Sequence, residues 1–231
     1  QYDCQGLAIS FNEPTLLFEW SLDVFPLVRE TGYYNTYITN GYMSSEALKL
    51  LAEHGLDGMN IDIKGDAEAV REHCHGNVEK VWRNAIEAKR LGIWVEITTL
   101  LVPRVNDDEK CLRVIASRIK RELGENTPWH VNAYFPRDDF AFERYGEATP
   151  MSTLVRAREI GMGEGLNYVY AGGYHAPYQN TYCPSCQELV IERYGFGFDS
   201  FEYRMAEGKK CPKCEQEIPV VGEYIPIRRS F

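Results

Sequence analysis

The chain has 231 residues, of which 44% are apolar and 26% charged, and its formal net charge is −9. This composition allows a sizeable core and excludes a wholly disordered chain, and the acidic balance argues against a nucleic-acid partner. The sequence has no run of about 18 apolar residues and no basic segment ahead of an apolar stretch. We therefore expect no membrane partner and a cytoplasmic location, while nothing in the sequence indicates an oligomeric state.

Apolar, β-branched runs alternate with helical patterns up to about residue 180. We expect strands at 7–11, 34–39, 57–63, 93–102, 129–135 and 166–171. Helical spacing of apolar residues predicts helices at 15–31, 45–54, 78–91, 106–123 and 152–164, the fourth beginning at Asn106 or Asp107. Strands that alternate with helices predict βαβ units and a parallel sheet. Because the alternation then stops, we expect one domain at 1–180 and a second at 181–231.

The second domain carries four of the seven cysteines of the chain, arranged in two pairs. Each pair has the form C-x2-C, and 24 residues separate them: Cys183, Cys186, Cys211 and Cys214. Two such pairs direct four sulfur atoms at one centre, which is the ligand set of a tetrahedral zinc site. Four protein ligands leave no open position, so we expect a structural site, although a rubredoxin-like iron site has the same ligands.

The other three cysteines are dispersed along the chain. Cys4 precedes the first strand, Cys74 stands between two histidines, and Cys111 falls on the apolar side of a helical pattern. We expect Cys111 to pack in the core, and we do not expect the three thiols to converge on one metal.

Polar residues follow the expected strands of the first domain, and parallel α/β folds place their sites at the carboxyl ends of strands. Asp62 and Lys64 alternate on one strand, so they point to the same side, where they need each other or a ligand. Pro14 restricts Glu13 to an extended conformation, which holds a carboxylate beside exposed backbone groups. This arrangement suits the binding of an ammonium group.

These segments resemble radical S-adenosylmethionine (SAM) enzymes, in the branch of the pyruvate formate-lyase activating enzymes. The resemblance rests on Asn12-Glu13-Pro14, Thr39-Asn40-Gly41 and Asp62-Ile63-Lys64, in this order. A closer likeness, to the radical SAM component of the AmmeMemoRadiSam system, extends over nearly the whole chain. It adds Asn106-Asp107-Asp108, Thr127-Pro128-Trp129-His130, Arg156-Ala157-Arg158-Glu159-Ile160-Gly161 and Asn180-Thr181-Tyr182-Cys183.

The resemblance implies an α/β fold, a partial (β/α)6 barrel of the TIM type that lacks its first strand, followed by a zinc ribbon. It implies SAM and a [4Fe–4S] cluster as cofactors, besides the zinc. The implied oxidoreductase activity is reductive cleavage of SAM to a 5′-deoxyadenosyl radical, which abstracts hydrogen from a partner protein or another substrate. By position, the resemblance places the SAM-binding residues at Asn12, Glu13, Thr39, Asn40, Asp62 and Lys64.

The sequence departs from the family at three points. The C-x3-C-x2-C motif that holds the cluster is absent, so we do not expect the chain by itself to cleave SAM. Phe135 stands where activating enzymes often carry a histidine for the SAM carboxylate, a contact that here falls to Lys64 or His130. Ile38 replaces an aspartate that helps to bind a monovalent cation in some activating enzymes, so we expect no such cation. No catalytic residue is assigned.

We expect the chain to be a fragment of a longer protein whose preceding part carries the cluster loop. A separate polypeptide that supplies the loop, and a barrel that has lost radical chemistry, are the alternatives. Two other function classes stay open: a lyase or aldolase that uses Lys64 as a Schiff-base amine, and a noncatalytic binding protein. In the latter, aromatic residues of the zinc module would contact a partner instead of packing a small core: Tyr182, Tyr194, Phe196, Phe198, Phe201 and Tyr203.

Overall fold

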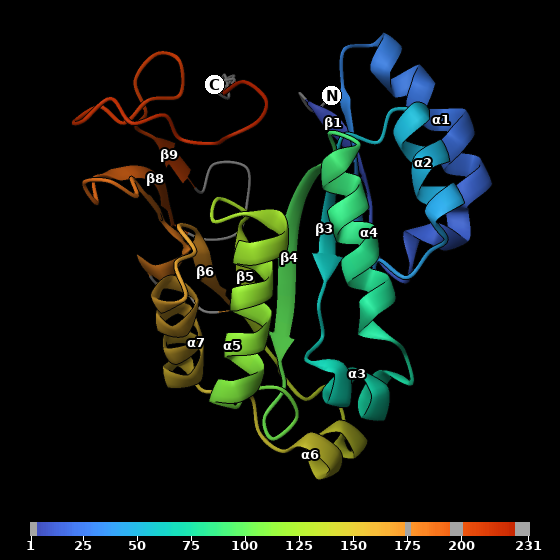
Figure 1. Cartoon of the computed structure of the whole chain (residues 1–231), viewed down its shortest axis with the longest axis vertical. Coiled ribbons are helices and arrows are strands. Elements are labelled where there is room, and N and C mark those ends of the chain that lie inside the picture. The colour runs from blue at the N-terminus through green and yellow to red at the C-terminus, as the bar shows by residue number, and fades with distance from the viewer. Residues whose placement is uncertain (1–3, 174–176, 195–200, 225–231) are drawn as a thin grey trace, which may run out of the picture.

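The computed structural model describes residues 4–173, 177–194 and 201–224. Its main element is a sheet of six parallel strands whose spatial order follows the chain order (Figure 1). The strands are β1 (Gly6–Ile9), β2 (Tyr34–Thr39), β3 (Gly58–Asp62), β4 (Trp94–Leu101), β5 (Trp129–Ala133) and β6 (Val169–Gly172). All six overlap the predicted runs, and their parallel pairing confirms the expected βαβ units.

Helical segments connect the successive strands. They are η1 (Pro14–Leu17), α1 (Phe18–Glu30), α2 (Ser45–Glu53), α3 (Ala67–Cys74), α4 (Val78–Arg90), α5 (Glu109–Arg118), η2 (Ile119–Leu123), α6 (Asp139–Tyr145) and α7 (Met151–Gly163). Right-handed connections between sequential neighbours place helices on one face of the sheet, and α4 and α5 lie in front of the strands in Figure 1. None of the described helices has the length and apolar character needed to cross a lipid bilayer.

Side chains that accept hydrogen bonds from backbone N–H groups begin five of the α-helices. The capping residues are Ser44, Asp66, Asn77, Asp108 and Asp138. The cap at Asp108 corrects the predicted start of the fourth helix, because α5 begins after this residue and not at 106 or 107. The short helices α3 and α6 lie outside the predicted helices.

The two faces of the sheet differ because side chains alternate along each strand. One face is apolar and packs into the core, with fully buried side chains such as Tyr37, Ile61, Ile97, Trp129 and Val131. The opposite face carries partly exposed polar side chains, among them Asn60, Asp62, Glu96, Thr98 and His130. The polar face is therefore the one on which a ligand can reach functional groups.

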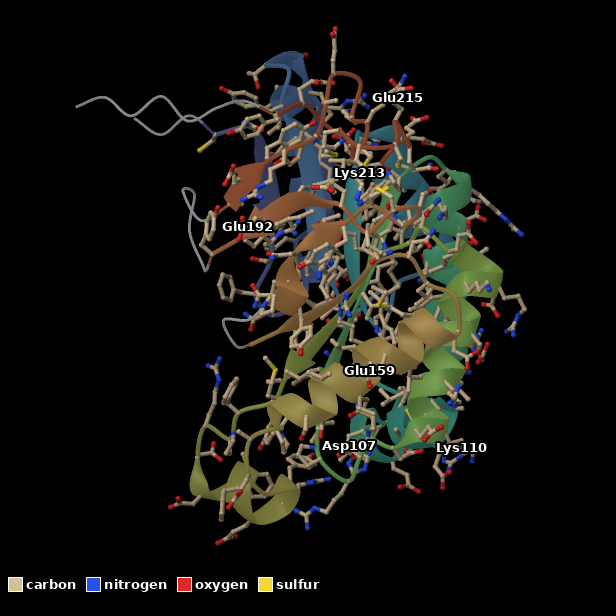
Figure 2. The ribbon with its side chains drawn as sticks, turned by 90° about the vertical axis from the view of Figure 1, so that its left-hand side faces the viewer. Asp107, Lys110, Glu159, Glu192, Lys213 and Glu215 are labelled. Atoms are coloured by element: carbon tan, nitrogen blue, oxygen red, sulfur yellow. The ribbon has the colours of Figure 1, made fainter. Side chains whose placement is uncertain are left out.

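Residues 177–194 and 201–224 form a C-terminal module. It contains η3 (Pro177–Gln179) and an antiparallel sheet of β7 (Thr181–Tyr182), β8 (Leu189–Arg193) and β9 (Phe201–Tyr203). Its small core includes Tyr168 from the first domain. In Figure 2, Glu192, Lys213 and Glu215 of the module lie at the opposite end of the molecule from Asp107 and Lys110, which follow β4. These three residues of the module thus lie away from the loop that follows β4.

Candidate functional site

Glu13 ties the loop after β1 to the end of β2. Its Oε1 atom accepts hydrogen bonds from the backbone N–H of Thr15 at 3.1 Å and from the hydroxyl groups of Thr15 and Thr39 at 2.6 Å each. Its Oε2 atom accepts a hydrogen bond from the backbone N–H of Asn40 at 2.8 Å. Four donors on one carboxylate fix the two strand ends relative to each other, so Glu13 and Thr39 act on the site through the backbone that they hold.

The turn before Glu13 has an unusual backbone. Phe11 and Asn12 have φ angles of 65° and 48°, in the left-handed region that residues with side chains seldom adopt. Such strain concentrates at functional sites, where the surrounding structure enforces it. Asn12, one of the predicted SAM-binding residues, is exposed. It therefore contributes a sharply bent backbone beside the Glu13 carboxylate.

Asp62 and Lys64 form an ion pair, with 2.5 Å between Oδ2 and Nζ, as their alternation along the strand predicts. Together with Asn40 they line a pocket of about 350 Å³ at the carboxyl ends of β2 and β3. Three of the six predicted SAM-binding residues thus meet at one pocket. Glu13 and Thr39 are bonded to each other and are not part of its lining.

The environment of Lys64 weighs against the lyase or aldolase hypothesis. A Schiff-base lysine is activated by desolvation in an apolar pocket or by a neighbouring cation. The Lys64 side chain is 44% exposed, and its nearest charged partner is the Asp62 carboxylate. These surroundings instead suit a lysine that binds an anionic group.

Two apolar residues stand at the positions where the sequence departs from the family. Ile38 in β2 and Phe135 after β5 are each 47% exposed. Ile38 offers no ligand to a cation, and Phe135 offers no hydrogen-bond donor to a carboxylate. Among the described residues that line the pocket, Lys64 is the side chain with a permanent positive charge.

Asn106 holds the backbone of Lys64 in place. It is not among the site residues predicted from the sequence. Its Nδ2 atom donates hydrogen bonds to the carbonyl oxygens of Lys64 at 2.8 Å and Leu100 at 2.9 Å. Its Oδ1 atom accepts a hydrogen bond from the N–H of Val102 at 2.7 Å. The side chain is 1% exposed, so it links the ends of β3 and β4 from within the protein.

We expect Asn106→Ala to destabilise the fold by about 2 kcal/mol or more and to weaken any ligand contact of Lys64, because it leaves buried backbone groups unpaired. Urea unfolding followed by circular dichroism measures the first effect. The control is Asn126→Ala, at an exposed position beyond the pocket. Equal stability of the two variants would contradict the role of Asn106.

A second polar cluster lies on the same face of the sheet. The Nε2 atom of His130 lies 2.7 Å from Oε2 of Glu96, whose Oε1 accepts a hydrogen bond from the indole N–H of Trp94 at 2.9 Å. Burial raises the pKa of the Glu96 carboxyl group, but the hydrogen bond and charge of His130 outweigh burial, so the pKa lies below its ordinary value. His130 therefore has Glu96 as its partner in this structure.

This lowered pKa predicts a pH dependence. A carboxyl group with a depressed folded-state pKa stabilises the fold above the unfolded value, about 4.3 for Glu, and loses that contribution as pH falls through the folded value. Glu96→Gln should therefore be less stable than the unmodified chain at pH 7, by a margin that shrinks as pH falls below about 4.3. Urea unfolding across this pH range, with the exposed Glu30→Gln as control, measures the margin; a constant margin would contradict the assignment.

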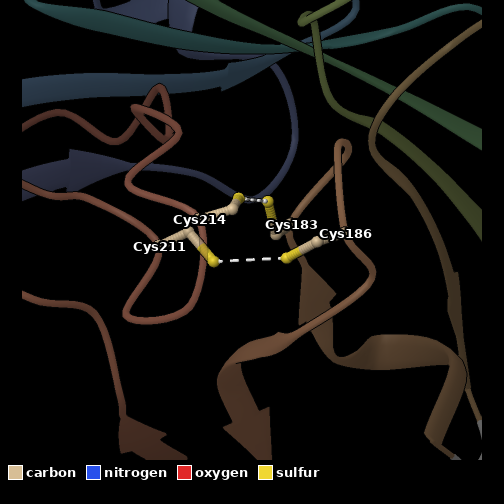
Figure 3. A group of neighbouring side chains, drawn as sticks. All are labelled: Cys183, Cys186, Cys211 and Cys214. Atoms are coloured by element: carbon tan, nitrogen blue, oxygen red, sulfur yellow. Dashed lines mark hydrogen bonds between the residues drawn. The ribbon is translucent and has the colours of Figure 1, made fainter.

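Four cysteine side chains gather in the C-terminal module (Figure 3). The sulfur atoms of Cys183 and Cys214 are 3.5 Å apart, as are those of Cys186 and Cys211, and all four lie within 4.8 Å of one another. A disulfide requires about 2.05 Å. Sulfur atoms at the corners of a zinc tetrahedron are about 3.8 Å apart, given Zn–S bonds of about 2.3 Å. The four cysteines could thus hold one metal ion.

The two C-x2-C turns have the same local structure. The residue after each second cysteine, Gln187 or Glu215, has a left-handed φ of 60° or 62°. Its backbone N–H donates a hydrogen bond to the carbonyl of the first cysteine, at 2.9 Å for Cys183 and 3.0 Å for Cys211. This repeated turn directs both sulfur atoms of a pair to the same side, which explains why the spacing predicts the site.

The remaining cysteines do not form a metal site. Cys4 and Cys74 are exposed, whereas Cys111 is buried on α5, as predicted. Burial raises the pKa of the Cys111 thiol to about 12, so this group is unreactive. Within the described part of the chain, no cysteine group besides the four of the module could hold a metal. The residues present therefore do not fit the ligand set of an additional [4Fe–4S] cluster.

Comparison with known proteins shows which sequences this chain resembles. Residues 1–113 match the model of the Radical SAM superfamily. The uncharacterized protein MJ0808 of Methanocaldococcus jannaschii is 40% identical over 224 residues, which are 96% of this chain and 65% of that protein. The chain thus spans about 65% of the length of this relative.

Solved structures share the fold at low sequence identity. A domain of a pyruvate-formate lyase-activating enzyme from Bacteroides vulgatus has a TM-score of 0.60 and 19% identity, over 74% of this chain and 100% of that one. Streptococcus suis SuiB, solved with its precursor peptide SuiA, has a TM-score of 0.59 and 15% identity, over 74% of this chain and 38% of that one. A radical SAM methyltransferase from Sphaerobacter thermophilus has a TM-score of 0.59 and 12% identity, over 80% and 55%. The family match confirms the resemblance of residues 1–113 to the radical SAM superfamily, and the solved structures show that the fold is shared.

Proposed function

We propose that this chain binds SAM at the carboxyl ends of β1, β2 and β3, as part of an oxidoreductase of the activating-enzyme type. The observation that carries the proposal is the meeting of Asn40, Asp62 and Lys64 at one pocket, within the segment that matches the superfamily. When SAM is bound, the chemistry that it supplies in this superfamily is hydrogen abstraction by a 5′-deoxyadenosyl radical after one-electron reductive cleavage.

The methionyl end of SAM is a zwitterion, which matches the Asp62–Lys64 pair in charge. Lys64 would donate to its carboxylate and Asp62 would accept from its ammonium, so that each residue exchanges its present partner for a ligand group. Asn106 holds the backbone of Lys64 while this exchange occurs. Glu13 does the same for Asn40, through the hydrogen bond to its N–H.

The proposed activity includes a [4Fe–4S] cluster, but the described residues do not supply its ligands. We derive no electron transfer within this chain and propose that another segment or another polypeptide holds the cluster. A protein or peptide is the proposed substrate, a proposal supported by the structure of SuiB with a precursor peptide. Among radical SAM enzymes, we propose the kind that forms the radical SAM component of the AmmeMemoRadiSam system.

The proposed architecture is a partial (β/α)6 barrel followed by a zinc ribbon. Sequential strand order and sequential right-handed crossovers support a barrel over a doubly wound sheet, which carries helices on both faces. The repeated cysteine turns and the sulfur spacing support a ribbon that holds a single tetrahedral zinc ion.

Three aromatic residues of the module contact one another. The rings of Tyr203 and Tyr224 stack with their centroids 4.7 Å apart, and Phe201 contacts Tyr224 edge-on at 5.8 Å. Tyr203 packs against the small core of the module, whereas Phe201 and Tyr224 are 41% and 44% exposed, so the cluster extends onto the surface and leaves the partner hypothesis open. Phe196 and Phe198 lie outside the described residues.

Calorimetric titration of the chain with SAM and with 5′-methylthioadenosine tests the proposal. Methylthioadenosine keeps the adenosine and lacks the methionyl zwitterion, so we expect SAM to bind at least about tenfold more tightly, the worth of one charge-assisted hydrogen bond. Equal affinity for the two compounds, or no binding of either, would overturn the proposal. Formation of 5′-deoxyadenosine, measured once the cluster-bearing part has been supplied, then tests the reaction itself.

A further inference from the structure

A second pocket lies on the polar face of the sheet, beside β5 and β6. It has a volume of about 430 Å³, and its lining includes Leu100, His130, Asn132, Tyr170 and Arg193. Arg193 comes from β8 of the C-terminal module, so the module reaches across to complete a wall of the first domain. None of the six residues proposed to bind SAM lines this pocket, but His130, the alternative to Lys64 for the SAM carboxylate, does.

Strand register places this pocket within reach of the proposed SAM site. Asp62 pairs with Thr98, Thr98 with His130, and His130 with Tyr170 across four neighbouring strands. Strands lie about 4.8 Å apart, so Asp62 and His130 are about 10 Å apart along this row. A molecule in the second pocket would therefore lie beside a cofactor bound at the first.

Arg193 is fixed in place before any ligand binds. Its Nη1 atom donates to the carbonyl of Gln179 at 2.7 Å and to the hydroxyl of Thr181 at 2.9 Å, and its guanidinium carbon lies 5.3 Å from the centre of the Tyr170 ring. Within the described residues, its Nε and Nη2 atoms have no hydrogen-bond partner. The N–H groups of Nε and Nη2 thus stay available to a planar anion.

Tyr170 and His130 extend this arrangement into the pocket. The ring of Tyr170 stacks on His130 at 5.2 Å, with 25° between the planes, and its hydroxyl lies 3.0 Å from that of Thr181. Glu96 holds the Nε2 side of the imidazole from the neighbouring smaller cavity and does not line this pocket. Among the described lining residues, Arg193 carries the permanent charge, and it interacts electrostatically with the Glu96 carboxylate behind His130.

We propose that this pocket binds the carboxylate of a second substrate, with Arg193 as its main contact and His130 and Asn132 as further hydrogen-bonding groups. The inference names a substrate class and so rests on the proposed function, but carboxylate binding can be measured without SAM. A single guanidinium balances one negative charge, which matches a carboxylate. Gly172 belongs to the same wall, because a Cβ atom there would lie 2.1 Å from Oδ1 of Asn132.

The test is an NMR titration of the full chain with acetate, benzoate and N-acetylglycine, each compared with its uncharged amide. We expect at least one carboxylate to bind about tenfold more tightly than its amide and to shift the His130 imidazole signals, while those of the distant His54 stay in place. Arg193→Gln should remove this preference. Arg204→Gln, which removes the same charge from an exposed ion pair of the same module, should retain it.

Circular dichroism and zinc content check the fold of both variants. The His130 shift is measured on the unmodified chain, so it does not depend on whether a variant folds. If no carboxylate binds better than its amide, or if Arg193→Gln binds like Arg204→Gln, the assignment is overturned. If SAM fails to bind while the Arg193-dependent preference is present, the proposed function fails and the carboxylate site stands. If SAM binds while the Arg193-dependent preference is absent, the carboxylate site is overturned and the proposed function stands.

Discussion

Replacing Cys183 by serine should abolish metal binding and unfold the C-terminal module while leaving the six-stranded sheet folded. Cys183 is fully buried, and the small core of the module counts two of the four cysteines, Cys183 and Cys211, among its buried residues. So small a core cannot hold the module without its metal, since structural zinc sites contribute roughly 10 kcal/mol of binding free energy that is coupled to folding. Zinc analysis should give one ion per unmodified chain and almost none in Cys183→Ser.

Cys74→Ser is the matched control, because it makes the same substitution at an exposed thiol outside the group. Hydrogen exchange should show loss of protection in β8 of the Cys183→Ser variant, with β3 and β4 unchanged. Full retention of zinc by Cys183→Ser would contradict the site, and iron in its place would identify a rubredoxin-like centre. Loss of metal from Cys74→Ser would also count against it.

Features that depend on neighbours in the sequence were predicted correctly. Each C-x2-C pair directs its two sulfur atoms to one side because its turn is local, with the same left-handed residue after the second cysteine. Asp62 ends β3 and Lys64 lies two residues beyond it, and the two side chains meet on the same side, as alternation along an extended chain predicts. Both results follow from periodicity and spacing, which a single sequence displays.

Features that depend on register between distant strands were missed. Asn106 reads as a helix start, but its amide group bonds the carbonyl of Lys64, 42 residues earlier in the chain. Glu96 and His130 form a pair only because β4 and β5 are aligned as they are. Neither pairing produces a periodic pattern in the sequence. The role of Arg193 was likewise invisible, since it depends on how the module packs against β6.

Replacing Lys64 by methionine should weaken SAM binding by about tenfold to a hundredfold, the worth of about 1.5–3 kcal/mol for a hydrogen bond to a charged group. Methionine keeps most of the apolar stem and removes the charge, so the pocket between β2 and β3 should keep its shape. Binding of 5′-methylthioadenosine should not change, because this compound lacks the carboxylate. Calorimetry with both ligands therefore separates loss of the contact from loss of the pocket.

Asp62→Asn and Lys49→Met complete the experiment. If Asp62 receives the ammonium of SAM, its neutral variant should also bind SAM more weakly; if it only restrains Lys64, the variant should bind more tightly, because Lys64 is then released from the ion pair. Lys49→Met removes the same charge from α2, away from the pocket lining, and should bind as the unmodified chain does. An unchanged SAM affinity in Lys64→Met would remove the charge match on which the SAM assignment depends. A parallel loss in Lys64→Met and Asp62→Asn, with methylthioadenosine binding intact, would mean that the ion pair opens to receive a zwitterion.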